Sequence, residues 1–107
     1  MIRLLFAASL ALSLAACGGP APQANVSNLR LVSENQEYPV VTGYLVNSGE
    51  VPISSADVFV TLYDRDNRPM EDVSIQVRTV SVGDSSRFER QLDLRPSGAK
   101  VKLVSAN

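Results

Sequence analysis

The hydrophobic residues of this chain follow two different patterns, one before residue 18 and one after residue 25. The apolar run of residues 4–14 is broken only by Ser9 and Ser13, and it is shorter than the roughly 20 apolar residues that a membrane-spanning helix needs. From residue 26 onward, apolar and polar residues alternate, which is the period of a half-buried β-strand. The pattern therefore predicts an N-terminal segment outside the fold, followed by an all-β domain.

The alternation predicts six or seven short strands with turn residues between them. The expected strands cover residues 26–32, 38–47, 56–63, 73–78, 88–94 and 100–103. The clearest is the strand over 56–63, which is dominated by β-branched and aromatic residues and places Val58, Val60 and Leu62 on one side. Short strands at this regular spacing are typical of a two-sheet sandwich.

The N-terminal segment has the features of an export signal. Met1-Ile2-Arg3 supplies a positive start, the apolar run follows it, and small residues come next. The sequence Leu14-Ala15-Ala16-Cys17 resembles the bacterial lipobox, in which the cysteine thiol is acylated before the signal is removed in front of it. The resemblance implies lipidation at Cys17 and two or three acyl chains, which hold a protein at a membrane essentially permanently. The alternative is an ordinary signal cut near Ala16 with a free thiol at Cys17, which is uncommon in exported proteins.

We therefore divide the chain into a lipoprotein signal peptide (1–16), a lipidated cysteine with a Gly/Pro tether (17–25) and a β-sandwich domain (26–107). Gly18 stands where an Asp would favour the inner membrane under the sorting rule of enterobacterial lipoproteins. The expected location is thus the outer membrane, with the domain on its periplasmic side. The tether from Gly18 to Asn25 spans at most roughly 25–30 Å, so the domain is expected to work close to the bilayer.

Three segments of the domain carry a family resemblance. Residues 41–49 read VTGYLVNSG, residues 62–64 read LYD, and residues 80–85 read VSVGDS before Phe88. They resemble the V-x-G-x-V-x-N-x-G strand, the name motif and the v-x-x-l-x-pG-x-s-x-x-F segment of the FxLYD family, small immunoglobulin-like domains of exported prokaryotic proteins. Val60 stands where the family has Phe, and Asn67 stands where a Gly is usual. The resemblance implies an all-β, immunoglobulin-like two-sheet sandwich and no settled activity.

Composition and charge exclude several classes of function. The formal net charge is −1, and nucleic-acid binding needs clustered Lys and Arg instead. The chain has no His, so a serine nucleophile would lack its usual base. A small sandwich also leaves little volume for a catalytic cleft. We expect no enzyme activity, no cofactor and no nucleic-acid partner.

The densest acidic cluster contains Asp64, Asp66 and Asn67, which makes a Ca²⁺ site a possibility to weigh. An EF-hand loop that began at Asp64 would need oxygen ligands where Arg68 and Ile75 stand, so that loop type is excluded. A looser oxygen cage would contain arginines that repel a cation. The favoured interpretation is a solvated hairpin whose Asp and Asn side chains bond their own backbone.

Two further groups of side chains are candidates for binding. Tyr44, Phe59 and Tyr63 are expected to share the outer face of two strands, and grouped aromatics on a sheet face mark contact surfaces. The alternative is an inverted register or a loop that covers them. The basic residues gather at positions 78, 87, 90 and 95. Arg90 is spaced by two from Phe88 and Leu92, so we expect it to snorkel at the end of the sandwich. The functional alternative is a small site for anionic lipid headgroups or an acidic partner.

Taken together, these features indicate a lipid-anchored periplasmic protein that binds an envelope protein, as an accessory subunit or a small adaptor. A small-ligand or ion-binding lipoprotein and a purely structural envelope protein are the alternatives. Lipidation is specified by the sequence pattern, whereas the partner is not.

Overall fold

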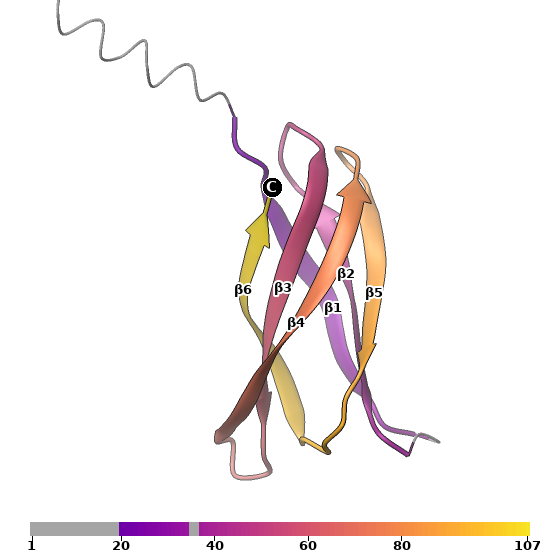
Figure 1. Cartoon of the computed structure of the whole chain (residues 1–107), viewed down its shortest axis with the longest axis vertical. Helices are drawn as coiled ribbons and strands as arrows, with labels where there is room; N and C mark the ends of the chain where they lie inside the picture. The colour runs from indigo at the N-terminus through magenta and orange to yellow at the C-terminus, as the bar shows by residue number, and fades with distance from the viewer. Residues whose placement is uncertain (1–19, 35–36) are drawn as a thin grey trace, which may run out of the picture.

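The computed structural model describes residues 20–34 and 37–107, and this part of the chain is all-β without a helix (Figure 1). The six strands are β1 (Ala24–Val32), β2 (Val40–Asn47), β3 (Ile53–Tyr63), β4 (Pro69–Val80), β5 (Ser85–Gln91) and β6 (Gly98–Ala106). Most of them are longer than the alternation alone predicted.

The strands form two antiparallel sheets of three strands each, one in the order β1-β2-β5 and the other in the order β4-β3-β6. We call them the β2 sheet and the β3 sheet after their central strands. Figure 1 shows the β3 sheet in front of the β2 sheet. The chain changes sheet after β2, after β4 and after β5, a crossing pattern typical of immunoglobulin-like sandwiches. The expected two-sheet sandwich is confirmed.

Both described ends of the chain lie at the same end of the sandwich, which we call the tether end (Figure 1). The backbone carbonyl of Gln23 accepts a hydrogen bond from the Ser48 N–H at 3.1 Å, and that of Asn107 accepts one from the Ser54 N–H at 2.8 Å. The opposite, far end carries the hairpin 64–68 and the segment 92–97, which follow β3 and β5.

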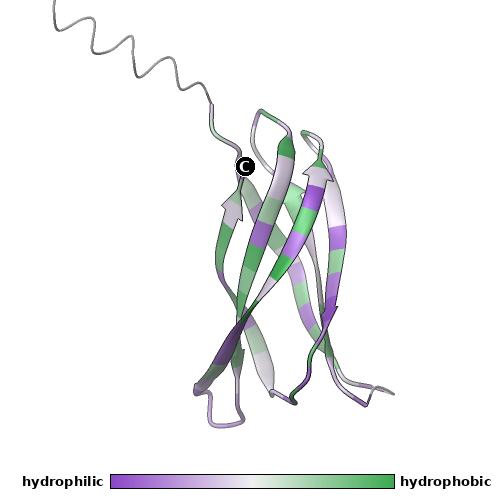
Figure 2. Ribbon diagram, in the orientation of Figure 1, coloured by the Kyte–Doolittle hydropathy of each residue, from purple (hydrophilic) through white to green (hydrophobic). Residues whose placement is uncertain are grey.

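The core lies between the two sheets, where the alternation placed it. Val41 and Leu45 of β2 and Val58, Val60 and Leu62 of β3 have no exposed surface. Figure 2 shows hydrophobic and hydrophilic residues alternating along the strands.

Gly43 lies on the inward side of β2 because the ring of Phe88 occupies the space beside it. A Cβ atom at this position would meet Phe88 Cζ at 2.7 Å, which is closer than carbon atoms pack. Gly43 and Phe88 are cross-strand partners in β2 and β5. The glycine in the middle of β2 and the phenylalanine of β5 thus pack against each other as one unit.

A bulge in β1 turns both halves of this strand toward the core. Two residues, Asn28 and Leu29, lie opposite the single residue Gly43, and Asn28 adopts a left-handed backbone with a φ of 54°. Val26 and Leu29 therefore both pack against the core although they are three residues apart. An unbroken strand would have placed them on opposite faces.

β1 begins two residues earlier than predicted, which shortens the tether. Ala24 pairs with Asn47, and Asn25 pairs with Val46. Both residues belong to the uncharged Gly/Pro segment 18–25 that the sequence pattern predicts as a tether. The backbone is thus held to the sandwich from Gln23 onward.

Candidate functional site

Tyr44 does not share a surface with Phe59 and Tyr63, although these two lie on the same face. Tyr44 belongs to β2, whereas Phe59 and Tyr63 belong to β3, and these strands are in different sheets. Each of the three points away from the core, since its neighbours along the strand are buried. The outer faces of the two sheets are opposite sides of the sandwich, so the expected grouping is wrong. The alternation predicts which side of a strand faces out, but not the sheet to which the strand belongs.

The outer face of the β3 sheet carries a group of aromatic, aliphatic and charged side chains. We use the name β3 face for the part of this outer surface that is formed by Phe59, Thr61, Tyr63, Asp72, Lys100, Lys102 and Leu103. Phe59 pairs with Leu103 of β6, whose side chain is 56% exposed. β6 contains a bulge at Lys102, between the pair Phe59–Leu103 and the pair Val60–Val101. Lys102 lies on the same face, where it reaches Asp72.

Hydrogen bonds and charges order the rest of the β3 face. The Thr61 hydroxyl donates to Asp72 Oδ1 at 2.8 Å, and Lys102 Nζ donates to Asp72 Oδ2 at 2.7 Å. These bonds, led by that from Lys102, lower the pKa of the Asp72 carboxyl, and the Asp72 carboxylate raises the pKa of Lys102. Lys100 Nζ lies 5.2 Å from the centroid of the Tyr63 ring, within the range of a cation–π contact.

The acidic hairpin directs its carboxylate oxygen toward its own backbone. Asp64 Oδ1 accepts hydrogen bonds from the N–H groups of Asp66 at 2.8 Å and Arg68 at 3.0 Å. Asn67 has a φ of 66°, the left-handed conformation that closes the turn. Within the described ranges 20–34 and 37–107, no group of three or more His, Cys, Asp or Glu side chains is arranged to hold a metal ion.

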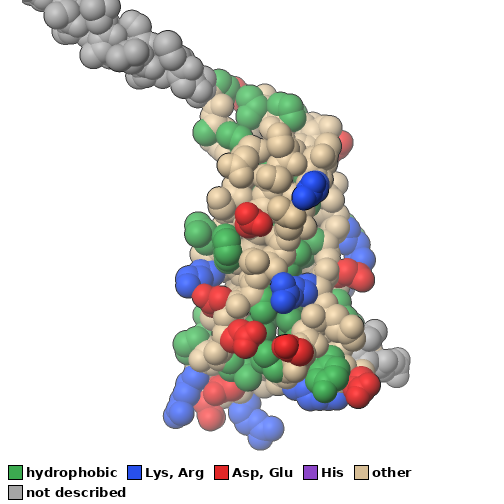
Figure 3. Space-filling model, viewed as in Figure 1, with side chains coloured by type: hydrophobic (Ala, Val, Ile, Leu, Met, Phe, Trp, Pro, Cys, Tyr) green, Lys and Arg blue, Asp and Glu red, His purple; other side chains and the backbone are tan. Residues whose placement is uncertain are grey.

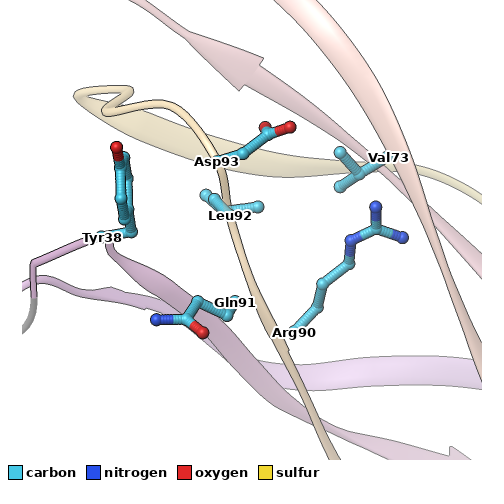
Figure 4. Close-up of a pocket in the computed structure, with 6 residues that line it drawn as sticks. All are labelled: Tyr38, Val73, Arg90, Gln91, Leu92 and Asp93. Carbon is cyan, nitrogen blue, oxygen red and sulfur yellow. The ribbon is translucent and has the colours of Figure 1, made fainter.

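A hollow of about 390 Å³ opens between β4 and the end of β5 (Figure 4). Its lining residues are Tyr38, Val73, Arg90, Gln91, Leu92 and Asp93. Arg90 extends from β5 across to β4 and donates to the backbone carbonyl of Ser74 at 2.7 Å. Arg90 therefore has a structural contact, because its guanidinium group donates a hydrogen bond to a backbone carbonyl of the edge strand β4.

A larger hollow, of about 690 Å³, lies on the outer face of the β2 sheet, on the side opposite to the β3 face. We call it the β2 hollow, and its lining residues are Asn28, Leu29, Arg30, Thr42, Tyr44 and Arg87. The spacing of residues along the chain does not group these side chains, because they come from the three strands β1, β2 and β5. Only the cross-strand register places Arg87 beside Tyr44 and Arg30 beside Thr42.

Cys17 and the rest of the expected signal segment lie outside the described residues. Among the residues that are described, no helix has the length and apolar character needed to cross a membrane.

We compared the chain with known protein families, curated proteins and solved structures. No protein-family model, curated protein or solved structure matches this chain.

Proposed function

We propose that this chain is a lipid-anchored envelope protein, held through Cys17 at the periplasmic side of the outer membrane, and that it binds a partner protein through the β3 face. The protein acts as an adaptor or accessory subunit and has no catalytic activity. The anchoring rests on the lipobox-like sequence before Cys17, and the domain construction agrees with the resemblance to exported FxLYD domains.

The observation that carries the binding proposal is the apolar pair of Leu103, which is exposed, and Phe59, which is half-buried. A leucine exposed over half of its surface, beside an aromatic ring on a sheet, is the kind of centre that protein interfaces bury. Lys100 and Lys102 lie on the same face; Lys102 is paired with Asp72, whereas Lys100 makes no ion pair with a described residue and lies over the Tyr63 ring. The partner surface that fits is apolar at its centre and acidic at its rim.

The strand edges are less suited to binding than this face. β1 and β6 each contain a bulge, with Asn28 and Lys102 at the irregular positions. β4 begins with Pro69, and Arg90 occupies the Ser74 carbonyl at its edge. Bulges, prolines and charged side chains at edges hinder the addition of another strand. We therefore place the contact on side chains of the sheet face and not on an added strand.

Photo-crosslinking in intact cells tests the proposal. A photoreactive amino acid at position 103 should give one dominant protein adduct, and the same amino acid at position 44, on the opposite face, should not give it. Lys100→Glu should reduce the adduct formed from position 103, because it reverses a charge at the rim, whereas Arg78→Glu, outside the β3 face, should leave it.

A ladder of unrelated envelope proteins from position 103, or the same adduct from positions 44 and 103, would contradict a specific contact through the β3 face.

A further inference from the structure

We propose that the β2 hollow is a binding site for a phosphate group. This site lies on the face opposite to the proposed protein contact and uses none of its residues. Only the source of the phosphate, discussed below, rests on the proposed lipid anchor.

The first observation is the buried hydroxyl of Thr42 at this hollow. Three polar side chains are buried in the described part of the chain: Asn47 (3% exposed), Thr42 (8%) and Thr61 (9%). Asn47 and Thr61 make hydrogen bonds to other residues. Among residues 20–34 and 37–107, the Thr42 hydroxyl has no such partner, although it faces outward and lines the hollow. Buried polar groups in proteins are almost always hydrogen-bonded, so this hydroxyl is available to a ligand.

The second observation is the placement of Arg30 and Arg87 on either side of Thr42 and Tyr44. Arg30 pairs with Thr42 from β1, and Arg87 pairs with Tyr44 from β5. Strands are about 4.8 Å apart and the two pairs are offset by two residues along β2, so the two arginines start roughly 12 Å from each other, a gap that two arginine side chains bridge from opposite sides.

The side chains around the hollow carry a positive charge that no described carboxylate neutralises. Arg87 pairs with Glu89 at 2.8 Å through one nitrogen, which holds it beside β2 and leaves its other N–H groups free for a further acceptor. Arg30 makes no ion pair with any described residue. Glu89, the cross-strand partner of Thr42 in β5, is the nearest carboxylate; it is paired with Arg87 and is not among the residues that line the hollow.

The set of donors suits phosphate better than carboxylate. Arg30 and Arg87 line the hollow from opposite strands, and Thr42, Tyr44 and Asn28 bring hydroxyl and amide groups to its lining residues. A carboxylate offers two oxygens in one plane, which a single arginine fork satisfies. A phosphate offers three terminal oxygens in different directions, and arginine is the residue that recognises it best.

The position of the hollow makes a lipid headgroup an accessible source. Tyr44 precedes by three residues the end of β2 at Asn47, so the hollow begins roughly 10 Å from the tether end. Residues 18–22 separate Cys17 from Gln23, the first residue held to the sandwich by a backbone hydrogen bond. The tether reaches roughly 20 Å at most, so an anchor at Cys17 would keep the hollow within roughly 30 Å of the lipid phosphates. Inorganic phosphate or a soluble phosphate ester has the same chemistry, and the experiment distinguishes these sources.

The test is an NMR titration of the protein purified with its native N-terminus in a non-ionic detergent. One arm adds inorganic phosphate, and the other adds phosphatidylglycerol to the micelles, with diacylglycerol as the matched lipid that lacks phosphate. We expect saturable shifts of the amide signals of Thr42, Tyr44 and Arg87 in at least one arm. Arg30→Gln, Arg87→Gln and Thr42→Val should each weaken binding, the arginine variants by about tenfold, the loss expected for one charge-assisted hydrogen bond.

Arg78→Gln, on the outer face of the other sheet, is the control and should leave the affinity unchanged. Shifts with phosphatidylglycerol alone assign the site to a lipid headgroup, and shifts with inorganic phosphate assign it to a soluble phosphate. The proposal is overturned by the absence of shifts in both arms, or by equal weakening in Arg78→Gln, which would indicate unspecific attraction. Because the inorganic phosphate arm needs neither acylation nor a protein partner, its outcome is independent of the proposed function.

Discussion

Asn47 joins the two sheets through a single buried side chain. Its Nδ2 donates to the carbonyl of Val51 at 2.9 Å and to that of Val80, in β4, at 3.0 Å. Its Oδ1 accepts a hydrogen bond from the Gly49 N–H at 3.0 Å. The same asparagine therefore ends β2, shapes the following turn and fixes the position of the other sheet.

Asn47→Ala should lower the free energy of unfolding by about 2–3 kcal/mol, because it leaves buried backbone groups without partners. Urea denaturation of the variant and the unchanged protein measures this difference. Asn25→Ala is the control, since Asn25 is an exposed residue in the neighbouring strand, and its effect should stay within about 0.5 kcal/mol. Equal effects of the two substitutions would contradict the assigned role of Asn47.

At the scale of the strands, outward-facing side chains connect the three members of the β3 sheet. Asp72 of β4 accepts hydrogen bonds from Thr61 of β3 and from Lys102 of β6. Both charged partners are exposed, and exposed ion pairs add little stability. The network instead fixes where the charges of the β3 face lie, since it holds Lys102 over the sheet.

The pKa of the Asp72 carboxyl should lie below its ordinary value, because the Lys102 ammonium and the Thr61 hydroxyl favour the ionised form. The stability that this carboxylate contributes is therefore present above the ordinary carboxyl pKa and is lost as the pH falls through the lowered pKa of the folded protein. Carbon-13 NMR titration of the carboxyl measures this value.

Lys102→Met should raise the pKa of Asp72 toward the ordinary value, because it removes the main cause of the shift. Lys100→Met is the matched control, since Lys100 faces the Tyr63 ring. An unchanged Asp72 pKa in Lys102→Met would show that the ion pair does not form in solution.

At the scale of the whole molecule, the two ends of the sandwich differ in character. The tether end carries Gln23, the turn after β2 and the chain end at Asn107, with few charged residues among them. The far end carries the charged hairpin 64–68, and Figure 3 shows charged side chains gathered toward that end. An anchor at Cys17 would place the tether end at the bilayer and present the two sheet faces and the far end to the periplasm.

Cys17→Ser should abolish membrane association, because it removes the proposed site of acylation and no apolar surface of comparable strength replaces it. Membrane and supernatant fractions after an alkaline wash, together with the mass of the native N-terminal peptide, measure this. Gly18→Ser is the control and should remain with the membranes. An unacylated Cys17, or a Cys17→Ser variant that still sediments, would remove the basis for the proposed location.

The approximate positions of the strands, their inward-facing sides and several turns follow from the pattern of residues along the chain. Alternation with a period of two is a local property, so it correctly placed Val41, Leu45 and Val60 in the core. The left-handed turn at Asn67 was predictable for the same reason, because an Asp or Asn side chain bonds its own backbone within a few residues.

Which side chains share a surface depends instead on how the strands are arranged in space. Tyr44 is separated from Phe59 because the chain changes sheet between β2 and β3, and alternation within a strand carries no information about that change. Arg30, Thr42 and Arg87 meet only through the pairing of three strands, and the bulge at Asn28 sets the register of one pairing. The side of a strand that faces the core follows from the spacing of neighbouring residues. A binding site on a sandwich follows from the pairing of strands that are distant along the chain.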